Sequence, residues 1–340
     1  MKISEILTIK HLAYYLYCEE DFLHSFFGGN IIIVDFRGET SVASRNKYSS
    51  FVEVLYIPKK NRRLGYREVY RPLSDNLTNT LKIFNGKLKE LYEPGPAAHG
   101  FVAGRNIGTN ATHHLAKQHV LSLDLYKFFE TIPASFIETG LKKLGFPSFA
   151  SDHLSKLVTL FGKLPQGYTT SPLLANLVAE DLDEALTNFV GENVSYTRYA
   201  DDLYFSSNKE VPDWRKLEEI IEAHGFSINP KKTKLMKRGG WQFVTGLTVF
   251  DNEKPRIPKK LKRNLRLEIY YLKKFGYRKQ ILRKLNYTEA DYETSFAVKM
   301  EVREERIKWM YRIDGWLNHF HAIEKTVAQR LREGFDSIGN

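Results

Sequence analysis

The sequence has 340 residues, of which 42% are hydrophobic, so it is long enough for a sizeable core and longer than one ordinary domain. Its formal charge of +11 favours a polyanionic partner, either nucleic acid or an acidic membrane surface. No apolar run approaches the length of a membrane span, no signal peptide opens the chain, and the one cysteine excludes an internal disulfide. We therefore expect a cytoplasmic protein.

Helical and strand-like patterns alternate in the first third of the chain. Residues 1–28 carry apolar side chains at helical spacing, and residues 31–34 are a short apolar run that predicts a strand. Residues 51–57 and 67–70 alternate like the strands of a hairpin, joined by a basic loop at 59–65. Such a loop is usually a solvated tip, but its charges would be functional if it faced a triphosphate.

A rigid turn is predicted near the middle of the chain, between helices expected over 151–160 and 173–186. Pro and Gly residues fix the backbone of this turn, which covers 164–172. Its ordinary interpretation is a loop between helices. Its functional interpretation is a rigid platform on which the Gln166 side chain hydrogen-bonds a nucleotide.

Two adjacent carboxylates interrupt a strand-like run later in the chain. Residues 194–199 and 203–206 are rich in Tyr, Val, Thr and Phe, so they predict a hairpin with Asp201 and Asp202 at its tip. An isolated Asp-Asp pair is most often a solvated turn. The alternative is a divalent-metal site, because neighbouring like charges repel unless a hard cation lies between them.

A third carboxylate, Asp124, favours the metal site. It belongs to a short apolar strand predicted over 119–125 and lies 77 positions before Asp201, too far for local pairing. If that strand lies beside the hairpin in one sheet, three carboxylates converge at one edge. Such a cluster can hold two metal ions roughly 3.5–4 Å apart, which clamp the attacking and leaving oxygens of a phosphoryl transfer. The pattern therefore indicates nucleotidyl transfer.

The last quarter of the chain is strongly basic. A helix is predicted over 214–224 and a strand over 241–249, and residues 255–340 then contain 20 Lys and Arg against 11 Asp and Glu, a difference of +9. Leu and Ile repeat there at helical spacing. A basic helical module appended to an acidic metal centre is suited to binding a nucleic-acid duplex. The rival interpretation is an amphipathic helix that lies on a membrane. The apolar face of this helix, however, lacks the bulky Trp and Phe side chains that anchor such helices.

The ordered motifs resemble those of the reverse transcriptase family, and look most like the enzymes of bacterial retrons. They extend from about residue 51 to the segment at 314–317, and in chain order they are Leu123–Phe129, Pro165–Gly167 with Ser171-Pro172 and Asn176-Leu177, Tyr199–Asp202, and Asn229–Thr233. Two further patterns are similar to those that distinguish retron enzymes from intron and retroviral ones, namely Asn110-Ala111-x-x-His114 and Val244-Thr245-Gly246.

The resemblance implies an α+β fold with the right-hand polymerase architecture of fingers, palm and thumb. The fingers would comprise residues 1–98 and 132–170. The palm, an antiparallel sheet backed by helices, would comprise residues 99–131 and 171–254. A helical, basic thumb would comprise residues 255–340.

The resemblance also implies roles for single residues. Asp124, Asp201 and Asp202 would bind two Mg²⁺ ions, for which Mn²⁺ substitutes, and the Leu125 carbonyl would be a further ligand. Lys232 would protonate the leaving pyrophosphate. Four residues would contact the incoming dNTP: Arg67, Phe129 as the steric gate against a 2′-hydroxyl, Gln166 and Gly167. RNA recognition would involve Asn110, His114, Val244, Thr245, Gly246, Lys259, Lys260 and Arg263.

Retron enzymes copy part of their own structured non-coding RNA and prime from the 2′-hydroxyl of a guanosine, which leaves a branched hybrid called msDNA. Together with a separate effector protein they serve in phage defence. The resemblance implies the same here, with the cognate RNA, its msDNA product, dNTPs and an effector as partners, and no membrane. Two alternatives stay open: a group II intron or diversity-generating reverse transcriptase, and a non-catalytic RNA-binding scaffold that restrains an effector.

Overall fold

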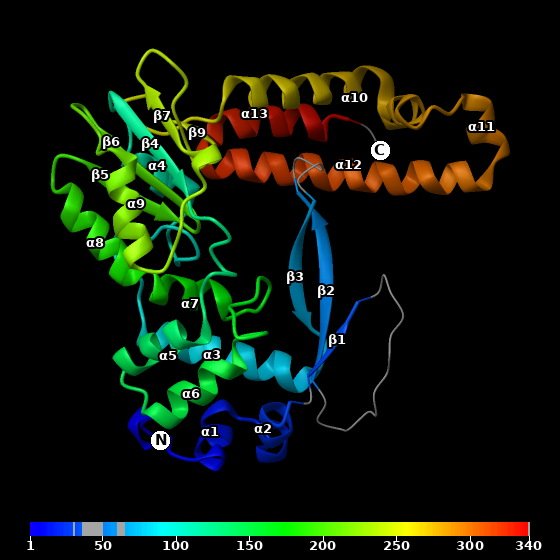
Figure 1. Cartoon of the computed structure of the whole chain (residues 1–340). Coiled ribbons are helices and arrows are strands. Elements are labelled where there is room, and N and C mark those ends of the chain that lie inside the picture. The colour runs from blue at the N-terminus through cyan, green and yellow to red at the C-terminus, as the bar shows by residue number, and fades with distance from the viewer. Residues whose placement is uncertain (30, 36–49, 60–64, 339–340) are drawn as a thin grey trace. The chain divides into compact units, whose positions relative to one another are not determined.

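The structure is a computed structural model that describes residues 1–29, 31–35, 50–59 and 65–338. Most of the basic loop predicted at 59–65 lies outside these residues. Figure 1 draws the whole chain with its helices and strands labelled. The chain divides into two compact units. Unit 1 comprises Met1–Asn106 and His119–Leu235, and unit 2 comprises Ile107–Gln118 and Met236–Asn340. The predicted division into fingers, palm and thumb uses other boundaries and stays a prediction.

Unit 1 combines two sheets with helices along most of its length. The helices are η1 (Ile3–Glu5), α1 (Ile9–Leu16), α2 (Glu20–Phe27), α3 (Asp75–Leu91), α5 (Ala134–Lys143), α6 (Ser148–Leu157), α7 (Ser171–Val178), α8 (Glu180–Val190), α9 (Trp214–Ala223) and η3 (Pro230–Lys232). The helical pattern at 1–28 is therefore broken, because Tyr17 adopts a left-handed conformation with φ 51° that ends α1.

The smaller sheet contains the predicted hairpin. Strand β2 (Ser50–Pro58) pairs antiparallel with β3 (Tyr66–Pro72) and parallel with β1 (Ile31–Val34), in the order β1-β2-β3. The hairpin expected over 51–57 and 67–70 is thus present and slightly longer than predicted.

The larger sheet has the order β5-β6-β4-β7, with strands β5 (Ser195–Tyr199), β6 (Asp202–Ser207), β4 (His119–Asp124) and β7 (Lys234–Lys237). Strand β6 runs antiparallel to both β5 and β4. Leu123, Leu203 and Phe205 are fully buried in the core cluster of unit 1. The strand that ends in Asp124 therefore lies beside the Asp201-Asp202 hairpin, which is the condition that the sequence argument required.

The single helix expected over 173–186 is two helices, α7 and α8. The chain turns at Ala179, whose ψ of 0° departs from helical geometry. Three acids in the first turn of α8 stabilise the new N-terminus: Glu180, Asp181 and Asp183. The turn also directs Asp183 into the interior, where it meets β5.

Asp183 forms a buried ion pair with Arg198, the fourth of the five residues of β5. The Arg198 side chain is fully buried, and its Nε and Nη2 donate to the two Asp183 carboxylate oxygens at 2.8 and 2.7 Å. Its Nη1 donates to Asn176 Oδ1 at 3.0 Å and to the Ala200 carbonyl at 3.3 Å. The Tyr196 hydroxyl donates to Asp183 as well, at 2.7 Å. One guanidinium thus connects two helices to the tip of the β5–β6 hairpin.

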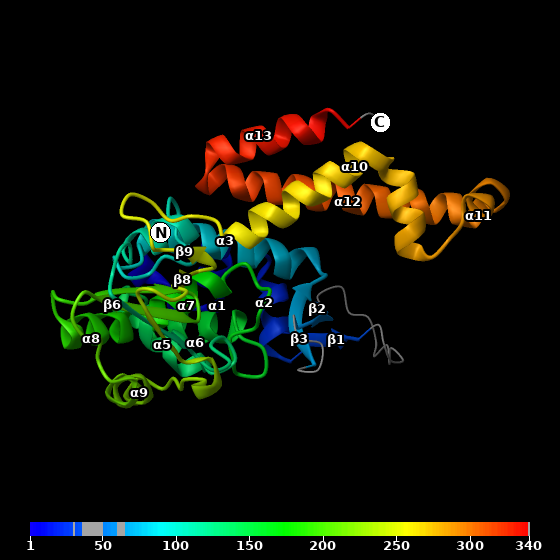
Figure 2. The same ribbon diagram turned by 90° about the horizontal axis from the view of Figure 1, so that it is seen from above.

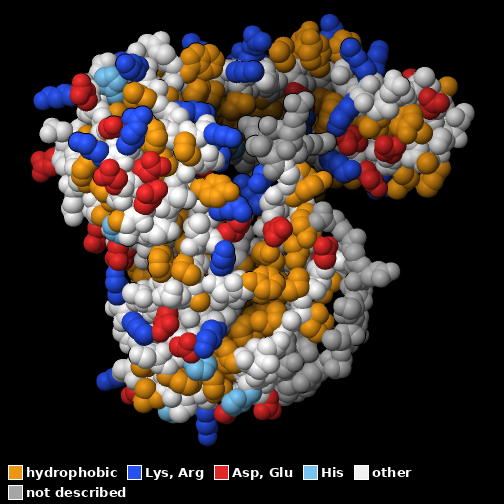
Figure 3. All heavy atoms as spheres, viewed as in Figure 1, with side chains coloured by type: hydrophobic (Ala, Val, Ile, Leu, Met, Phe, Trp, Pro, Cys, Tyr) orange, Lys and Arg blue, Asp and Glu red, His pale blue; other side chains and the backbone are white. Residues whose placement is uncertain are grey.

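Unit 2 is largely helical. Its helices are α4 (Ile107–Thr112), α10 (Lys259–Leu285), α11 (Glu289–Thr294), α12 (Phe296–Ile323) and α13 (Lys325–Asp336). Helices α10, α12 and α13 lie side by side in Figures 1 and 2, and they bury apolar residues such as Leu265, Ile313 and Leu317. Figure 3 shows Lys and Arg side chains along these helices. Within the described residues, no helix combines the length and the apolar character needed to cross a bilayer.

The strand expected over 241–249 is a short hairpin, β8 (Phe243–Val244) and β9 (Leu247–Thr248). Its two turn residues, Thr245 and Gly246, have φ of 47° and 82°, and a two-residue turn of this kind needs positive φ at both positions. The Thr245 hydroxyl donates to the Ile107 carbonyl at 2.9 Å, which fastens the turn to α4. The two motifs that resemble retron signatures therefore form one substructure.

The residues of these motifs differ in burial, and their part in RNA recognition stays a prediction. Asn110, His114 and Val244 have no exposed surface, so their side chains cannot touch RNA in this conformation. They support the α4–hairpin substructure instead. Neither amide atom of Asn110 has a hydrogen-bond partner within the described part of the chain, and such burial costs free energy.

The Arg198–Asp183 pair yields a first prediction. Arg198→Met leaves a buried carboxylate without its partner, so the free energy of unfolding should fall by about 3–5 kcal/mol. Urea unfolding followed by circular dichroism measures this change. Arg215→Met is the matched control, because Arg215 forms an exposed ion pair with Asp213 and its loss should cost less than about 1 kcal/mol. The double variant Arg198→Met/Asp183→Leu should recover stability. A single variant as stable as its parent would refute the role of the pair.

Asn110 yields a second prediction. Asn110→Leu replaces an unpaired buried amide by an apolar side chain of similar size, so the free energy of unfolding should rise by about 1 kcal/mol. The same urea titration measures it. Asn176→Leu is the control with the opposite expectation, because the Asn176 amide donates to the Gly100 carbonyl at 2.9 Å and accepts from Arg198. If Asn110→Leu destabilises the protein as much as Asn176→Leu does, the Asn110 amide has a bonding role.

Candidate active site

Strand register brings the three predicted aspartates to one end of the larger sheet. Asp124, the last residue of β4, is the direct cross-strand partner of Asp202, the first residue of β6. Side chains of directly opposed residues project to the same face of a sheet. Asp201 occupies the turn just before Asp202, and its carbonyl accepts a hydrogen bond from the Leu125 amide at 2.8 Å. The hairpin tip is therefore bonded to the residue that follows Asp124.

Burial and mutual repulsion raise the pKa values of two of these carboxylates, Asp201 and Asp202. Burial raises the pKa of Asp202 to about 7, with the neighbouring charges of Asp201 and Asp124 as further causes. Burial also raises the pKa of Asp201, and the charge of Asp124 adds to this effect. The like charges are thus close enough to interact, which is the electrostatic setting that a divalent cation relieves.

Lys232 provides a positive charge beside Asp124. Its Nζ lies 2.7 Å from Asp124 Oδ2, and more than half of its side chain is exposed. Backbone hydrogen bonds hold the η3 segment in place, because the Asn229 amide donates to the Asp124 carbonyl at 2.8 Å and the Tyr126 amide to the Ser227 carbonyl at 2.7 Å. Lys232 can therefore reach a ligand from a fixed backbone.

The three carboxylates fit a divalent metal by their chemistry, since they supply hard oxygen donors of like charge at one point. In the described residues, however, no three acidic, histidine or cysteine side chains already enclose a space for an ion. Lys232 serves as the counter-ion of Asp124 instead. A metal would have to displace this ammonium and draw the carboxylates together.

The predicted nucleotide-contacting residues all belong to unit 1, and Arg67 is the one whose charge acts on the carboxylates. Arg67 is exposed on β3, and its charge lowers the pKa of Asp201, opposing the effect of burial. The Gln166 carbonyl accepts from the Tyr70 amide at 2.7 Å, so the platform turn is bonded to the β2–β3 hairpin. Gly167 has φ 111°, and a Cβ at this position would collide with the Tyr70 carbonyl. Only glycine permits this close approach.

Phe129 is half-buried and is held by aromatic neighbours. Its ring centroid lies 5.5 Å from that of Phe128 and 6.1 Å from that of Phe101, with tilted or edge-on geometry. A ring fixed in this way can act as a rigid wall. Whether it excludes a 2′-hydroxyl stays a prediction.

Two supporting residues were not singled out from the sequence. Arg198 binds the Ala200 carbonyl, and Ala200 has a positive φ of 56° at the first position of the two-residue turn. Gly100 closes the same turn from the other side, since a Cβ there would lie 2.5 Å from the Ala200 amide nitrogen. The available signal for Arg198 was a charged residue within a run of strand-forming Tyr, Val and Thr residues.

The predicted RNA-contacting residues of unit 2 differ in exposure. Thr245 is half-buried, whereas four residues are exposed: Gly246, Lys259, Lys260 and Arg263. With Asn110, His114 and Val244 buried, only the exposed and half-buried residues can contact RNA directly.

Comparison with known proteins identifies the family. The family described as "Reverse transcriptase (RNA-dependent DNA polymerase)" matches residues 57–278, more than half of the chain. The chain is 32% identical over 224 residues to the Retron Ec86 reverse transcriptase of Escherichia coli, covering 64% of this chain and 68% of that protein. It is 30% identical over 287 residues to the Retron Ec73 reverse transcriptase of Escherichia coli, covering 75% and 90%.

The Retron Mx162 reverse transcriptase of Myxococcus xanthus is 36% identical over 214 residues, which cover 52% of this chain but only 44% of that protein. The chain therefore spans less than half of the length of this relative. Family membership and fold follow from the matches together with the order of strands around Asp124. This chain belongs to the reverse transcriptase family, and within it to the enzymes of bacterial retrons, with the α+β right-hand polymerase fold.

Proposed function

We propose that this protein is an RNA-directed DNA polymerase that copies part of a structured non-coding RNA into DNA. The observation that carries the proposal is the register of β4 and β6, in which Asp124 lies opposite Asp202 with Asp201 in the adjoining turn. Three carboxylates at one sheet edge, beside a lysine and an arginine, suit the binding of metal ions and a triphosphate.

Each residue near the site then has a distinct role. Asp124, Asp201 and Asp202, with the Leu125 carbonyl, would hold two Mg²⁺ or Mn²⁺ ions, which activate the attacking hydroxyl and neutralise the triphosphate. Arg67 would bind the triphosphate from β3. Lys232, whose ammonium already lies 2.7 Å from Asp124, would donate a proton to the leaving pyrophosphate.

Two further features, one aromatic ring and one turn, would select the nucleotide. The Phe129 ring, wedged against Phe128 and Phe101, would lie under the sugar and exclude a 2′-hydroxyl. The Gln166-Gly167 turn, bonded to β3 through Tyr70, would hold the base in register with the template. Both roles depend on rigid backbone, which the packing and the hydrogen bond supply.

The finer proposal follows the relatives named as retron enzymes. We infer that the template is a cognate non-coding RNA, that synthesis starts from the 2′-hydroxyl of a guanosine in that RNA, and that the product is msDNA. We also infer that the complex acts with a separate effector protein in defence against phage. The likeness to the Ec86 and Ec73 retron enzymes supports this inference, as does the joined substructure of α4 and the β8–β9 hairpin.

The aspartates yield a third prediction. Asp201→Asn removes one of three charges at the site, so DNA synthesis should fall at least about 100-fold, since a metal contributes several kcal/mol to such reactions. The measurement is dNTP incorporation on an RNA template, together with detection of branched DNA when the chain is expressed with its flanking RNA locus. Asp336→Asn, an exposed acid on α13, is the control and should keep full activity. Synthesis that persists in Asp201→Asn would refute the assignment, and RNA binding without synthesis by the parent would favour the scaffold alternative.

Metal binding yields a fourth prediction. A ligand that binds the folded state at 100 times its Kd stabilises by about 2.7 kcal/mol, so Mn²⁺ should raise the Tm by several degrees. The double variant Asp201→Asn/Asp202→Asn should lose this shift, and its Tm in EDTA should exceed that of the parent because the repulsion among buried carboxylates is relieved. Differential scanning calorimetry measures both effects. The Asp336→Asn control should retain the shift, and an equal shift in the double variant would place the metal elsewhere.

A further inference from the structure

A cavity of about 610 Å³ lies within unit 2, and all of its lining residues belong to that unit. Residues 240–243 and 248–251, which flank the β8–β9 hairpin, form one part of its lining, and residues 256–262 at the start of α10 form another. Glu324, the residue after α12, completes it. Cavities of this size accept ligands as large as a nucleotide.

Exposed aromatic rings give this cavity its apolar character. Trp241 is 76% exposed and Phe250 is 56% exposed. The Trp241 ring centroid lies 5.9 Å from that of Phe243, and the Arg238 guanidinium lies 4.6 Å from the centre of Phe250. Aromatic faces left this open to water favour a flat partner that can stack on them, and every nucleobase offers such a face.

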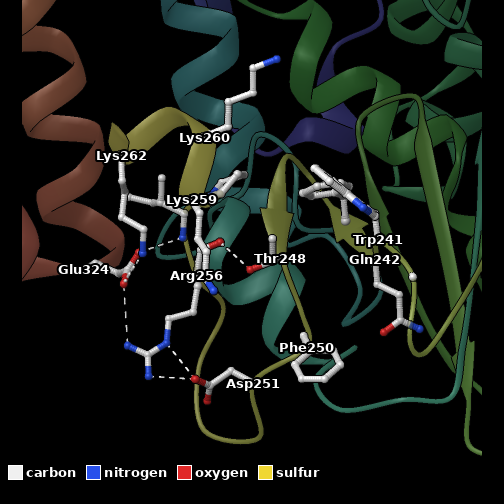
Figure 4. Close-up of a pocket in the computed structure, with 14 residues that line it drawn as sticks. Trp241, Gln242, Thr248, Phe250, Asp251, Arg256, Lys259, Lys260, Lys262 and Glu324 are labelled. Atoms are coloured by element: carbon white, nitrogen blue, oxygen red, sulfur yellow. Dashed lines mark hydrogen bonds and ion pairs between the residues drawn. The ribbon is translucent and has the colours of Figure 1, made fainter. Parts of the chain in front are cut away.

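Internal ion pairs neutralise the acids of the cavity. Arg256 lies 2.8 Å from Asp251 and 3.7 Å from Glu324, and Lys262 lies 3.0 Å from Glu324. The Ile257 amide donates to Glu324 as well, at 2.9 Å. Figure 4 shows these pairs on one side of the cavity and Trp241 on the other. Neither carboxylate is left to repel a polyanion.

Two cations of the cavity are left without such compensation. Lys259 and Lys260 are exposed, and neither forms an ion pair with any residue that the structure describes. They begin α10, whose first turn adds the partial positive charge of a helix N-terminus. The cavity therefore combines aromatic surface with positive charge that is free to bind phosphate, which is the pattern of single-stranded nucleic-acid sites.

We propose that this cavity binds an unpaired base of single-stranded RNA, which stacks on Trp241 while the neighbouring phosphates contact Lys259 and Lys260. The proposal rests on the proposed function in taking RNA as the strand that the protein holds. A stacked base explains the exposed indole, and two adjacent free lysines suit the phosphates on either side of one nucleotide. A base-paired duplex has no free face to offer, so the cavity should distinguish single strands from duplexes.

The test is a binding titration of the full chain with a 12-nucleotide oligo(U) RNA, followed by fluorescence anisotropy. Trp241→Ala should weaken binding roughly 5- to 100-fold, the range expected for the loss of one stacked base. Trp241→Phe keeps a ring and should stay within about 3-fold of the parent. Tyr311→Ala is the matched control, because Tyr311 is an aromatic residue of unit 2 with the same 76% exposure, and it should bind as the parent does.

Two further RNAs distinguish the contribution of base stacking from that of phosphate contacts. An abasic 12-mer keeps the phosphates but offers nothing to stack, so the parent and Trp241→Ala should bind it equally, and a blunt RNA duplex should give the same equality. Lys259→Gln/Lys260→Gln should weaken binding to oligo(U) and to the abasic strand alike, and should reduce the salt dependence by about two charges.

Three results would overturn the proposal. They are unchanged oligo(U) binding in Trp241→Ala, an equal loss on the abasic strand, or binding of single-stranded oligo(dT) at least tenfold tighter than oligo(U). Extension of a DNA primer on saturating poly(rA) reports on the catalytic assignment alone. Asp201→Asn should not extend this primer, whereas the role of Trp241 is judged by oligo(U) binding, so a failure of the polymerase assignment stays distinguishable from a failure of this one.

Discussion

The structure depends on one unfavourable electrostatic arrangement, the opposition of Asp124 and Asp202 across the β4–β6 pair. Like charges directly opposite each other destabilise a sheet, and burial makes the repulsion stronger. The fold tolerates the arrangement because a one-residue slip of register would send every side chain of β6 to the other face. Leu203 and Phe205 would then leave the apolar core cluster of unit 1, and polar side chains of β6 would take their places. Hydrophobic burial along the strand therefore keeps the carboxylates together.

The hairpin tip needs separate support, because it carries backbone strain as well as charge. Ala200 adopts a positive φ where glycine is the preferred residue, and such strain persists only where the surroundings over-determine the conformation. The Arg198 guanidinium binds the Ala200 carbonyl from within the sheet, and the backbone at Gly100 closes the turn on its other side. Asp183 holds the guanidinium, and the Asn176 amide joins it to the Gly100 carbonyl. A buried ion pair thus fixes the turn that carries Asp201, beside Asp202.

The sequence predicted those features that local pattern determines. The alternation in 51–57 and 67–70, the apolar run that ends at Asp124 and the strands around Asp201 all appear where expected, since strand periodicity is a local property. Features set by tertiary packing were not predicted from the sequence. The helix break at Ala179 follows from the path that brings Asp183 to Arg198, and the turn at Thr245-Gly246 from the positive φ that a tight hairpin requires. Burial of Asn110, His114 and Val244 likewise arises only when α4 packs on the hairpin. A motif shows that residues matter together, but not which of them face solvent.

Charge compensation distinguishes the charged side chains that stabilise the fold from those that are available to ligands. Arg198 with Asp183, and Glu324 with Arg256 and Lys262, are pairs whose partners satisfy one another. In contrast, the three aspartates have more negative charge than Lys232 can neutralise, while Lys259 and Lys260 have no acidic partner in the described chain. An uncompensated charge at a fixed position costs free energy in the free protein, and a ligand of opposite sign recovers it. The aspartates therefore suit cations, and the two lysines suit a polyanion. Because compensated pairs adjoin both sites, the backbone that presents each excess charge stays in place before the ligand arrives.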